Sequence, residues 1–165
     1  MSRWVAVVET AHVTTLAAVV GIVAVDPFAR MRSAADWSGW LAGQQRLDRV
    51  MSRAAPPLLL SATATAAGAS LVAFGQHEIP LATGRALAAG CVAAAVAVTL
   101  VVNEPMNTRL RAWSPLDAPP DDWRAVREQW DRGHGWRRAL LALAAFASGW
   151  GAARSRTDPR SRPRC

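Results

Sequence analysis

The fold of this chain is decided at residues 85–103, which read RALAAGCVAAAVAVTLVVN. Between Arg85 and Asn103 the stretch carries no charged residue and consists almost entirely of Ala, Val, Leu and Gly. A run of about 20 apolar residues is what an α-helix needs to cross the hydrocarbon core of a membrane. Similar apolar stretches occupy residues 4–25, 54–75 and 136–153. The sequence therefore predicts an all-α fold, a four-helix transmembrane bundle with amphipathic connecting helices.

Arg-rich stretches separate the apolar ones. Of the 165 residues, 52% are hydrophobic and 19% are charged, and the net charge is +7. Basic residues normally flank membrane helices, and the chain has neither a zinc-ligand spacing nor a nucleic-acid-binding motif. We therefore expect membrane lipid and no nucleic acid as a partner, with residues 1–153 forming a single domain in a bacterial cell membrane. Residues 154–165 are rich in Arg and Pro, which predicts a disordered tail.

The distribution of arginine predicts an orientation. The first and third connections, together with Arg137 and Arg138, hold more Arg than the amino terminus, the second connection and the tail do. Under the positive-inside rule, the two long connections lie in the cytoplasm and both termini lie outside.

The first apolar stretch has two interpretations. Arg3 followed by an apolar run is also typical of a secretory signal peptide. Glu9 and His12 interrupt the run, and VAVD at residues 23–26 is a poor cleavage site, which favours a membrane span. Ionisable side chains inside a membrane are functional candidates. We expect Glu9 to reach back to the membrane surface, whereas His12 lies deeper and remains a candidate for a functional site.

The polar connections are expected to contain helices of their own. In residues 26–53, apolar and Gln side chains follow helical spacing, which predicts an amphipathic helix at the membrane interface. Pro56 and Pro57 would then stand in the first turn of the second span, where a missing amide hydrogen costs little. In residues 104–135 a second helix is expected to begin at Asp121 and Asp122, after a run of prolines.

Small residues recur every fourth position in the later spans. We expect these stripes to be the faces on which the helices pack closely, although the alternative is that Ala is simply abundant in this chain. The stripes are Ala62, Ala66 and Ser70; Ala89, Ala93 and Ala97; and Ala144, Ser148 and Ala152.

Polar residues gather where the third span ends and the fourth begins. The two strings are NEPMNTRLRAW at residues 103–113 and WRAVREQWDRGHGWRR at residues 123–138. An Asn, His or Arg at membrane depth is costly unless it finds a partner or faces a cavity. We therefore expect these side chains to converge in one polar pocket: Asn103, Asn107, Trp130, His134 and Arg137.

These two strings resemble the anthrone oxygenase-like family of small four-helix membrane proteins. The family pattern is roughly N-x-P-x-N, a downstream Trp, and then W-x-x-x-H-x-x-R leading into the last helix. Its positions here are Asn103, Pro105, Asn107, Trp113, Trp130, His134 and Arg137. The close match covers about residues 100–150, whereas the first half agrees only in layout, with Gln44 and Gln45 in the first connection.

The resemblance implies, for some members, oxidation of a polyketide anthrone to an anthraquinone with O₂ and without a metal or another cofactor. His134 would be the base, because imidazole titrates near pH ~6.5. Asn103 and Asn107 would hold phenolic or carbonyl oxygens, and Arg137 would stabilise the developing oxyanion. The residues expected to contact the flat aromatic substrate are Trp113, Trp130, Gln44 and His12.

Two other functions remain open. A noncatalytic membrane accessory protein would use the motif only structurally, with His134 hydrogen-bonded to Asn107 and with the two Asn residues capping and bridging helices. A haem or metal redox protein using His12 and His134 is the weakest hypothesis, because these residues lie at different depths without a carboxylate cluster. The sequence names neither the substrate nor the oligomeric state.

Overall fold

The structure, a computed structural model, describes residues 3–24, 33 and 36–157. These residues form long helices, and no strand occurs among them, which confirms the all-α prediction. The elements are α1 (Arg3–Ala24), α3 (Trp37–Gly75), α4 (Ile79–Val98), a π-helical turn (Thr99–Asn103), α5 (Glu104–Ala112) and α6 (Trp123–Thr157). Val25, Arg30 and Arg32, which the sequence places at the end of the first span and in the first connection, lie outside the described residues.

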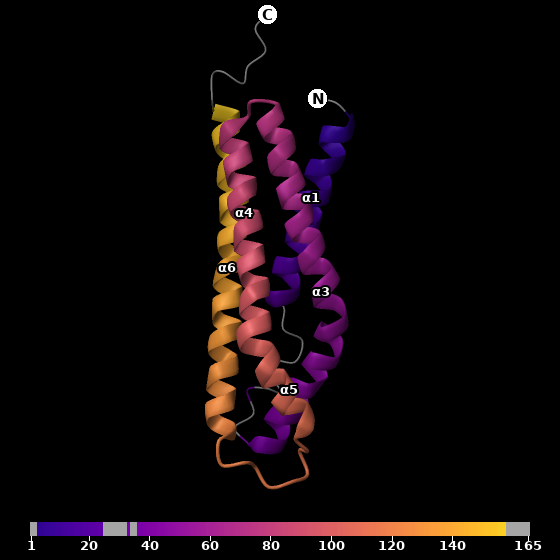
Figure 1. Ribbon diagram of the computed structural model, residues 1–165, viewed down its shortest axis with the longest axis vertical. Helices are drawn as coiled ribbons and strands as arrows, with labels where there is room; N and C mark the ends of the chain where they lie inside the picture. The colour runs from indigo at the N-terminus through magenta and orange to yellow at the C-terminus, as the bar shows by residue number, and fades with distance from the viewer. Residues whose placement is uncertain (1–2, 25–32, 34–35, 158–165) are drawn as a thin grey trace, which may run out of the picture.

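The helices lie side by side and run alternately in opposite directions (Figure 1). α3 packs on α1 and α4, and α6 packs on α4 and α1, so that α1 and α4 face each other across the bundle diagonal. The start of α1, the turn between α3 and α4 and the end of α6 share one end, which we call the terminal end. α5 and the loop before α6 lie at the opposite end, the loop end.

Three helices are long and apolar enough to cross a membrane: α1, α3 and the continuous helix from Ile79 to Ala112. The fourth predicted span lies in α6, which is not among these three because Arg residues bound its apolar run on both sides. α6 nevertheless lies along α4 (Figure 1). The 39 residues of α3 extend about 58 Å at ~1.5 Å per residue. Since the hydrocarbon core is about 30 Å thick, part of the bundle extends beyond it.

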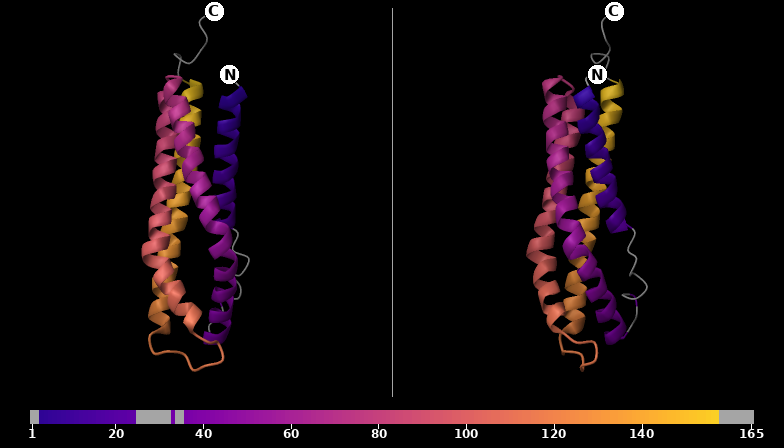
Figure 2. Two further views of the ribbon diagram at one scale, coloured as in Figure 1. Left: turned by 45° about the vertical axis from the view of Figure 1, so that its right-hand side comes forward. Right: turned by 90° about the vertical axis from the view of Figure 1, so that its right-hand side faces the viewer.

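The amphipathic helix expected in the first connection exists, but it is continuous with the second span. Both belong to α3, so the expectation that Pro56 and Pro57 stand in a first turn was wrong. They lie inside the helix, where each proline removes an amide donor and disturbs the preceding turn. α3 bends along its length (Figure 2), as an internal proline pair leads one to expect.

α6 likewise unites two expected elements. The helix predicted after Asp122 and the fourth span form one helix from Trp123 to Thr157. It extends past residue 153, where we expected a disordered tail to start, and residues 158–165 lie outside the described part of the chain. On this continuous helix, Trp130, His134 and Arg137 occupy adjacent turns, which brings them to neighbouring positions.

The small-residue stripes were predicted correctly on α3 and α6 but wrongly on α4. Ala62, Ala66, Ala144 and Ser148 are buried. On α4, Ala93 and Ala97 are exposed, and the buried face consists of Ala82, Gly84, Arg85, Ala88, Val92 and Ala95. The rotation of α4 follows from its contact with α6, because a Cβ on Gly84 would lie only 2.6 Å from the carbonyl oxygen of Ala147.

Two core clusters fill the bundle. The aliphatic cluster, which includes Val19, Leu59 and Leu141, lies between α1, α3, α4 and α6. The tryptophan cluster lies toward the loop end and includes Trp37, Trp40, Leu47, Leu110, Trp123 and Trp130. Large flat side chains suit the loop end, where α1 no longer accompanies the other helices (Figure 2).

Candidate functional site

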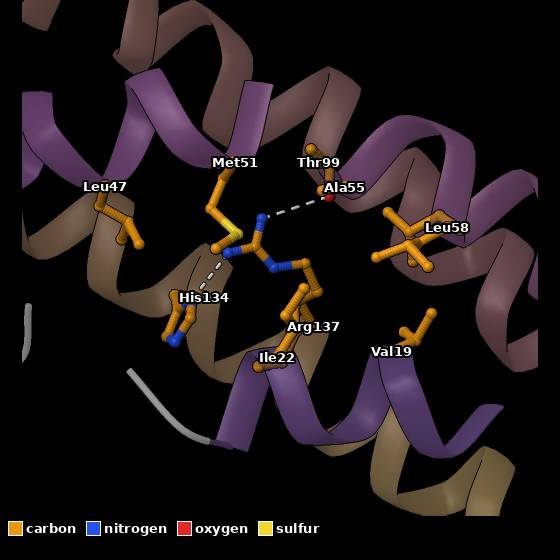
Figure 3. A pocket seen from close by; sticks show the side chains of 11 residues that line it. Val19, Ile22, Leu47, Met51, Ala55, Leu58, Thr99, His134 and Arg137 are labelled. Carbon is orange, nitrogen blue, oxygen red and sulfur yellow. Dashed lines mark hydrogen bonds between the residues drawn. The ribbon is translucent and has the colours of Figure 1, made fainter. Parts of the chain in front are cut away.

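A cavity of about 60 Å³ lies where the two core clusters meet. Val19, Leu59 and Leu47, which belong to these clusters, are among its lining residues. α1 and α3 supply most of the apolar wall, whereas Thr99 and α6 supply the polar side (Figure 3). The cavity therefore combines an apolar wall with one polar side, as small-molecule sites commonly do.

His134 and Arg137 form the polar side of the cavity. The Arg137 guanidinium donates one hydrogen bond to Nδ1 of His134 at 2.7 Å and a longer one to Oγ1 of Thr99 at 3.4 Å (Figure 3). A guanidinium is only a donor, so Nδ1 of His134 is the acceptor and the ring is neutral, with its proton on Nε2. The basic lone pair of His134 therefore points at Arg137.

Trp130 links His134 to the loop end. Its ring stacks on the imidazole with centroids 5.0 Å apart and an interplanar angle of 11°. Its indole Nε1 donates to Oδ1 of Asn107 at 2.9 Å. Asn107 in turn donates to Glu104 at 3.3 Å, and Glu104 accepts from Arg111 at 2.8 Å. A chain of hydrogen bonds thus connects His134's stacking partner with an exposed ionic network.

Asn103 is completely buried behind Trp130. Its Nδ2 donates to the backbone carbonyl of Trp130 at 3.2 Å, and its Oδ1 has no hydrogen-bond partner among the described residues. The close fit depends on Gly133, because a Cβ there would lie 2.9 Å from Oδ1 of Asn103. Asn103 ends the π-helical turn that starts at Thr99, a local departure from α-geometry that recurs at functional sites.

We call the five residues Asn103, Asn107, Trp130, His134 and Arg137 the His134 cluster. The structure brings them together between the π-helical turn, α5 and α6, but they do not share one polar pocket, because only His134 and Arg137 line the cavity. The expected bond between His134 and Asn107 does not occur, because Asn107 binds the indole of Trp130 instead.

Gln44 lies on the side of α3 that also carries two cavity residues, Leu47 and Met51. Its side chain is buried, and its Oε1 has no hydrogen-bond partner among the described residues. Trp113 lies elsewhere, in the tryptophan cluster, with its ring centroid 5.3 Å from that of Trp37. Gln44 therefore lies on the cavity side of α3 without lining the cavity, whereas Trp113 lies at the loop end.

His12 is separate from the cavity. Its Nε2 lies 2.8 Å from Oγ of Ser148, which also accepts a hydrogen bond from Arg85. Ser148 follows His134 by fourteen positions on α6, which corresponds to about 21 Å along the helix. Consequently, the two histidines do not share a site.

Arg85 is the centre of this second group, which we call the Arg85 cluster: Glu9, His12, Arg85 and Ser148. The guanidinium reaches across the bundle diagonal and donates to Glu9 at 2.5 Å and to the backbone carbonyl of Ser148 at 3.2 Å. Glu9 was expected to reach for the membrane surface, but it pairs with Arg85 inside the bundle.

Arg85 was not among the expected site residues, because it stands at the edge of an apolar run. A usable signal existed: Glu9 and Arg85 each follow the first residue of their helix by six positions. α1 and α4 start at the same end of the bundle, so opposite charges at equal depth can meet. Thr99 was overlooked as well, although it lies one turn before Asn103 and hence near the same face.

The model of the family described as anthrone oxygenase matches the chain over residues 47–148. That range contains the whole His134 cluster and Arg85, whereas His12 and Gln44 precede it. No curated protein and no solved structure matches the chain.

Proposed function

The chain belongs to the anthrone oxygenase family, and on this premise we propose that it oxidises a flat aromatic anthrone to an anthraquinone with O₂ in a bacterial cell membrane. The substrate class is a small aromatic polyketide. The observation that carries the proposal is the contact between His134 and Arg137 on the polar side of an otherwise largely apolar cavity. This pair combines a base with a donor for a developing negative charge.

The proposed reaction starts at the central methylene carbon of the anthrone. A base removes one proton, and the resulting anion is delocalised over the rings onto the carbonyl oxygen. The anion gives its electrons to O₂ and a carbon–oxygen bond forms. Loss of the second C–H hydrogen and cleavage of the O–O bond then leave a new carbonyl group and water. One atom of O₂ enters the anthraquinone and the other enters the water.

His134 and Arg137 carry out the proton transfer and charge stabilisation in this proposal. Arg137 donates a hydrogen bond to the basic Nδ1 of His134. A substrate oxygen that accepts from Arg137 draws the guanidinium away and exposes Nδ1 as the base. The same guanidinium then stabilises the oxyanion, so that substrate binding and activation of the base are coupled.

The neighbouring polar groups orient the substrate in this proposal. Oδ1 of Asn103 and Oε1 of Gln44 are buried acceptors without a partner among the described residues. A phenolic hydroxyl that donates to such an atom removes the cost of leaving a buried acceptor unsatisfied. The ring of Trp130, which stacks on the imidazole, holds His134 in its orientation at the cavity.

The size of the cavity sets a condition for this function. Binding pockets for small molecules typically have about 300 Å³ or more, whereas this cavity has about 60 Å³. Side chains must therefore move when a three-ring ligand binds. Met51 and Arg137 line the cavity with flexible side chains, and methionine readily adapts to a new neighbour.

A noncatalytic membrane accessory protein is the second candidate. The same cavity volume favours it, because the polar side chains then serve to satisfy one another and hold the helices together. The two functions differ in what His134 contributes.

The test is turnover of anthrone by the protein in lipid nanodiscs, followed by anthraquinone absorbance and O₂ uptake above the spontaneous rate. We expect His134→Ala and His134→Gln to lower kcat by about 100-fold or more, the usual contribution of a general base, while both variants stay folded. His77→Asn is the matched control. His77 is exposed in the turn between α3 and α4 with a φ of 60°, a conformation that asparagine tolerates.

Three results would contradict the proposal. Full activity in both His134 variants would mean that His134 is structural and that the base is another residue. Absence of turnover by the unmodified protein would favour the accessory protein. Failure of the His134 variants to accumulate in the membrane would favour it too, because the cluster would then be needed for folding.

A further inference from the structure

We propose that flat apolar ligands reach the cavity from the lipid through a groove between α1 and α6. This inference rests on the proposed function, because it concerns the ligand of the same site. The groove has a volume of about 480 Å³ and is lined from α1 by Val20, Val23 and Ala24 and from α6 mainly by Gly135, Arg138 and Ala139. We call it the α1–α6 groove.

The groove and the cavity lie on two sides of one thin partition. Val23 lines both of them. On α6, His134 and Arg137 line the cavity, and the next residue in each case, Gly135 or Arg138, lines the groove. The side chain of Val23 and one face of α6 therefore separate a ligand in the groove from the polar side of the cavity.

The helices that separate the groove from the cavity pack loosely at the level of Val23. α1 packs on α6 much less extensively than α4 does, and α1 ends at Ala24, beside the groove. Gly135 has no side chain, and a Cβ there would meet nothing within 4 Å. A small outward shift of the last turn of α1, carrying Val23, is enough to join the two spaces. Helix ends with few packing contacts open more readily than well-packed helix centres.

The membrane is the natural source of the ligand. α1 is apolar enough to cross a membrane, and only His12, Leu16 and Val19 of this helix are buried in the bundle. A three-ring aromatic ketone partitions from water into apolar surroundings and collects in the lipid. Arg138 is exposed at the groove and offers guanidinium donors to a carbonyl or phenolic oxygen, next in the chain to Arg137. The ligand oxygen would thus pass from one arginine to the other.

A kinetic measurement separates an access route from a binding site. Narrowing a route slows association and dissociation equally and leaves Kd unchanged, whereas altering a site changes Kd. The probe is anthraquinone, which needs no turnover, added to the protein in lipid nanodiscs and followed by stopped-flow quenching of tryptophan fluorescence. We expect Gly135→Leu to slow both rates by roughly tenfold with the same Kd.

A second variant and a control complete the experiment. Ala139→Leu fills the groove from the next turn of α6 and is expected to act in the same direction as Gly135→Leu. Gly149→Leu is the matched control: Gly149 is also an exposed glycine of α6 with nothing within 4 Å of its Cβ position, and it does not line the groove. We expect its rates to equal those of the unmodified protein.

The possible failures are distinguishable. Unchanged rates in both groove variants would overturn the access route. The same result is expected if a lipid acyl chain is the normal occupant of the groove. A changed Kd with an unchanged association rate would also overturn it, because the groove would then belong to the binding site. Absence of anthraquinone binding to the unmodified protein would overturn the proposed function itself, together with the route that depends on it.

Discussion

The Arg85 cluster and the His134 cluster both place polar side chains between the helices, but they differ in what these side chains bind. Arg85 donates to the Glu9 carboxylate and to two oxygen atoms of Ser148. Arg137 donates to an imidazole nitrogen and a hydroxyl group. No residue of the Arg85 cluster lines the site cavity, whereas His134 and Arg137 do.

This difference separates a structural cluster from a candidate site. Both arginines make charge-assisted hydrogen bonds, but only Arg85 is also paired with an opposite charge, the Glu9 carboxylate. The bond between Arg85 and Glu9 fixes two helices across the bundle diagonal. Donors that bind neutral groups beside a cavity can exchange these partners for a ligand at lower cost. Burial of a polar group alone therefore does not mark a site; exchangeable partners and adjacent space do.

The largest loss of stability is expected when the Arg85 cluster is broken. We expect Arg85→Ala to lower the free energy of unfolding by about 3–5 kcal/mol, because it leaves Glu9 without its cationic partner inside the bundle. The measurement is equilibrium unfolding of the protein in mixed micelles. The double variant Glu9→Gln/Arg85→Met removes both charges and should recover much of the loss. A loss below about 1 kcal/mol would mean that water stabilises Glu9.

The next largest loss of stability is expected when alanine replaces a buried glycine, and two such glycines can be compared. A Cβ on Gly84 would meet the backbone of Ala147 at 2.6 Å, whereas a Cβ on Gly133 would meet the side chains of Asn103 and Val102 at 2.9 Å. Side chains give way more easily than backbone, so Gly84→Ala should cost about 1–3 kcal/mol and Gly133→Ala less. Gly90→Ala, with open space at its Cβ position, is the control. Thermal unfolding in nanodiscs gives the order, and a reversed order would show that Asn103 cannot move.

A smaller loss is expected inside the His134 cluster. Trp130→Phe keeps a ring that can stack on His134 but removes the indole donor to Asn107. The expected cost is about 0.5–1.5 kcal/mol of unfolding free energy, the usual net value of one hydrogen bond. Equilibrium unfolding measures this cost. A loss as large as that of Arg85→Ala would remove the distinction between the two clusters.

The smallest change in stability is expected for Asn103→Leu. The variant loses the bond to the Trp130 carbonyl and also removes an acceptor that has no partner among the described residues, so the two effects offset within about 1 kcal/mol. Binding of 2-hydroxyanthraquinone should nevertheless weaken, because the acceptor proposed for a phenolic hydroxyl is gone, whereas unsubstituted anthraquinone has no donor for that acceptor and should bind as before. Strong destabilisation with unchanged binding would instead make Asn103 a structural residue.

The residues around the site show where sequence reasoning succeeds. The spacing of Trp130, His134 and Arg137 predicts one helix face, and the structure confirms it because α6 runs without interruption through Gly133 and Gly135. The same reasoning left open whether His12 joins the site. His12 stands within an apolar run and His134 stands among arginines, but neither sequence context reports which of them borders a cavity.

The sequence alone determined the all-α architecture, the apolar helices and the grouping of Asn103, Asn107 and His134 near one end. These follow from local periodicity and from the length of an apolar run, which each segment carries by itself. Only the tertiary structure decided the rotation of α4, the pairing of Glu9 with Arg85 and the contact of Arg137 with Nδ1 of His134. These depend on how closely two helices approach, at Gly84 above all, and on which side chains then meet across the bundle.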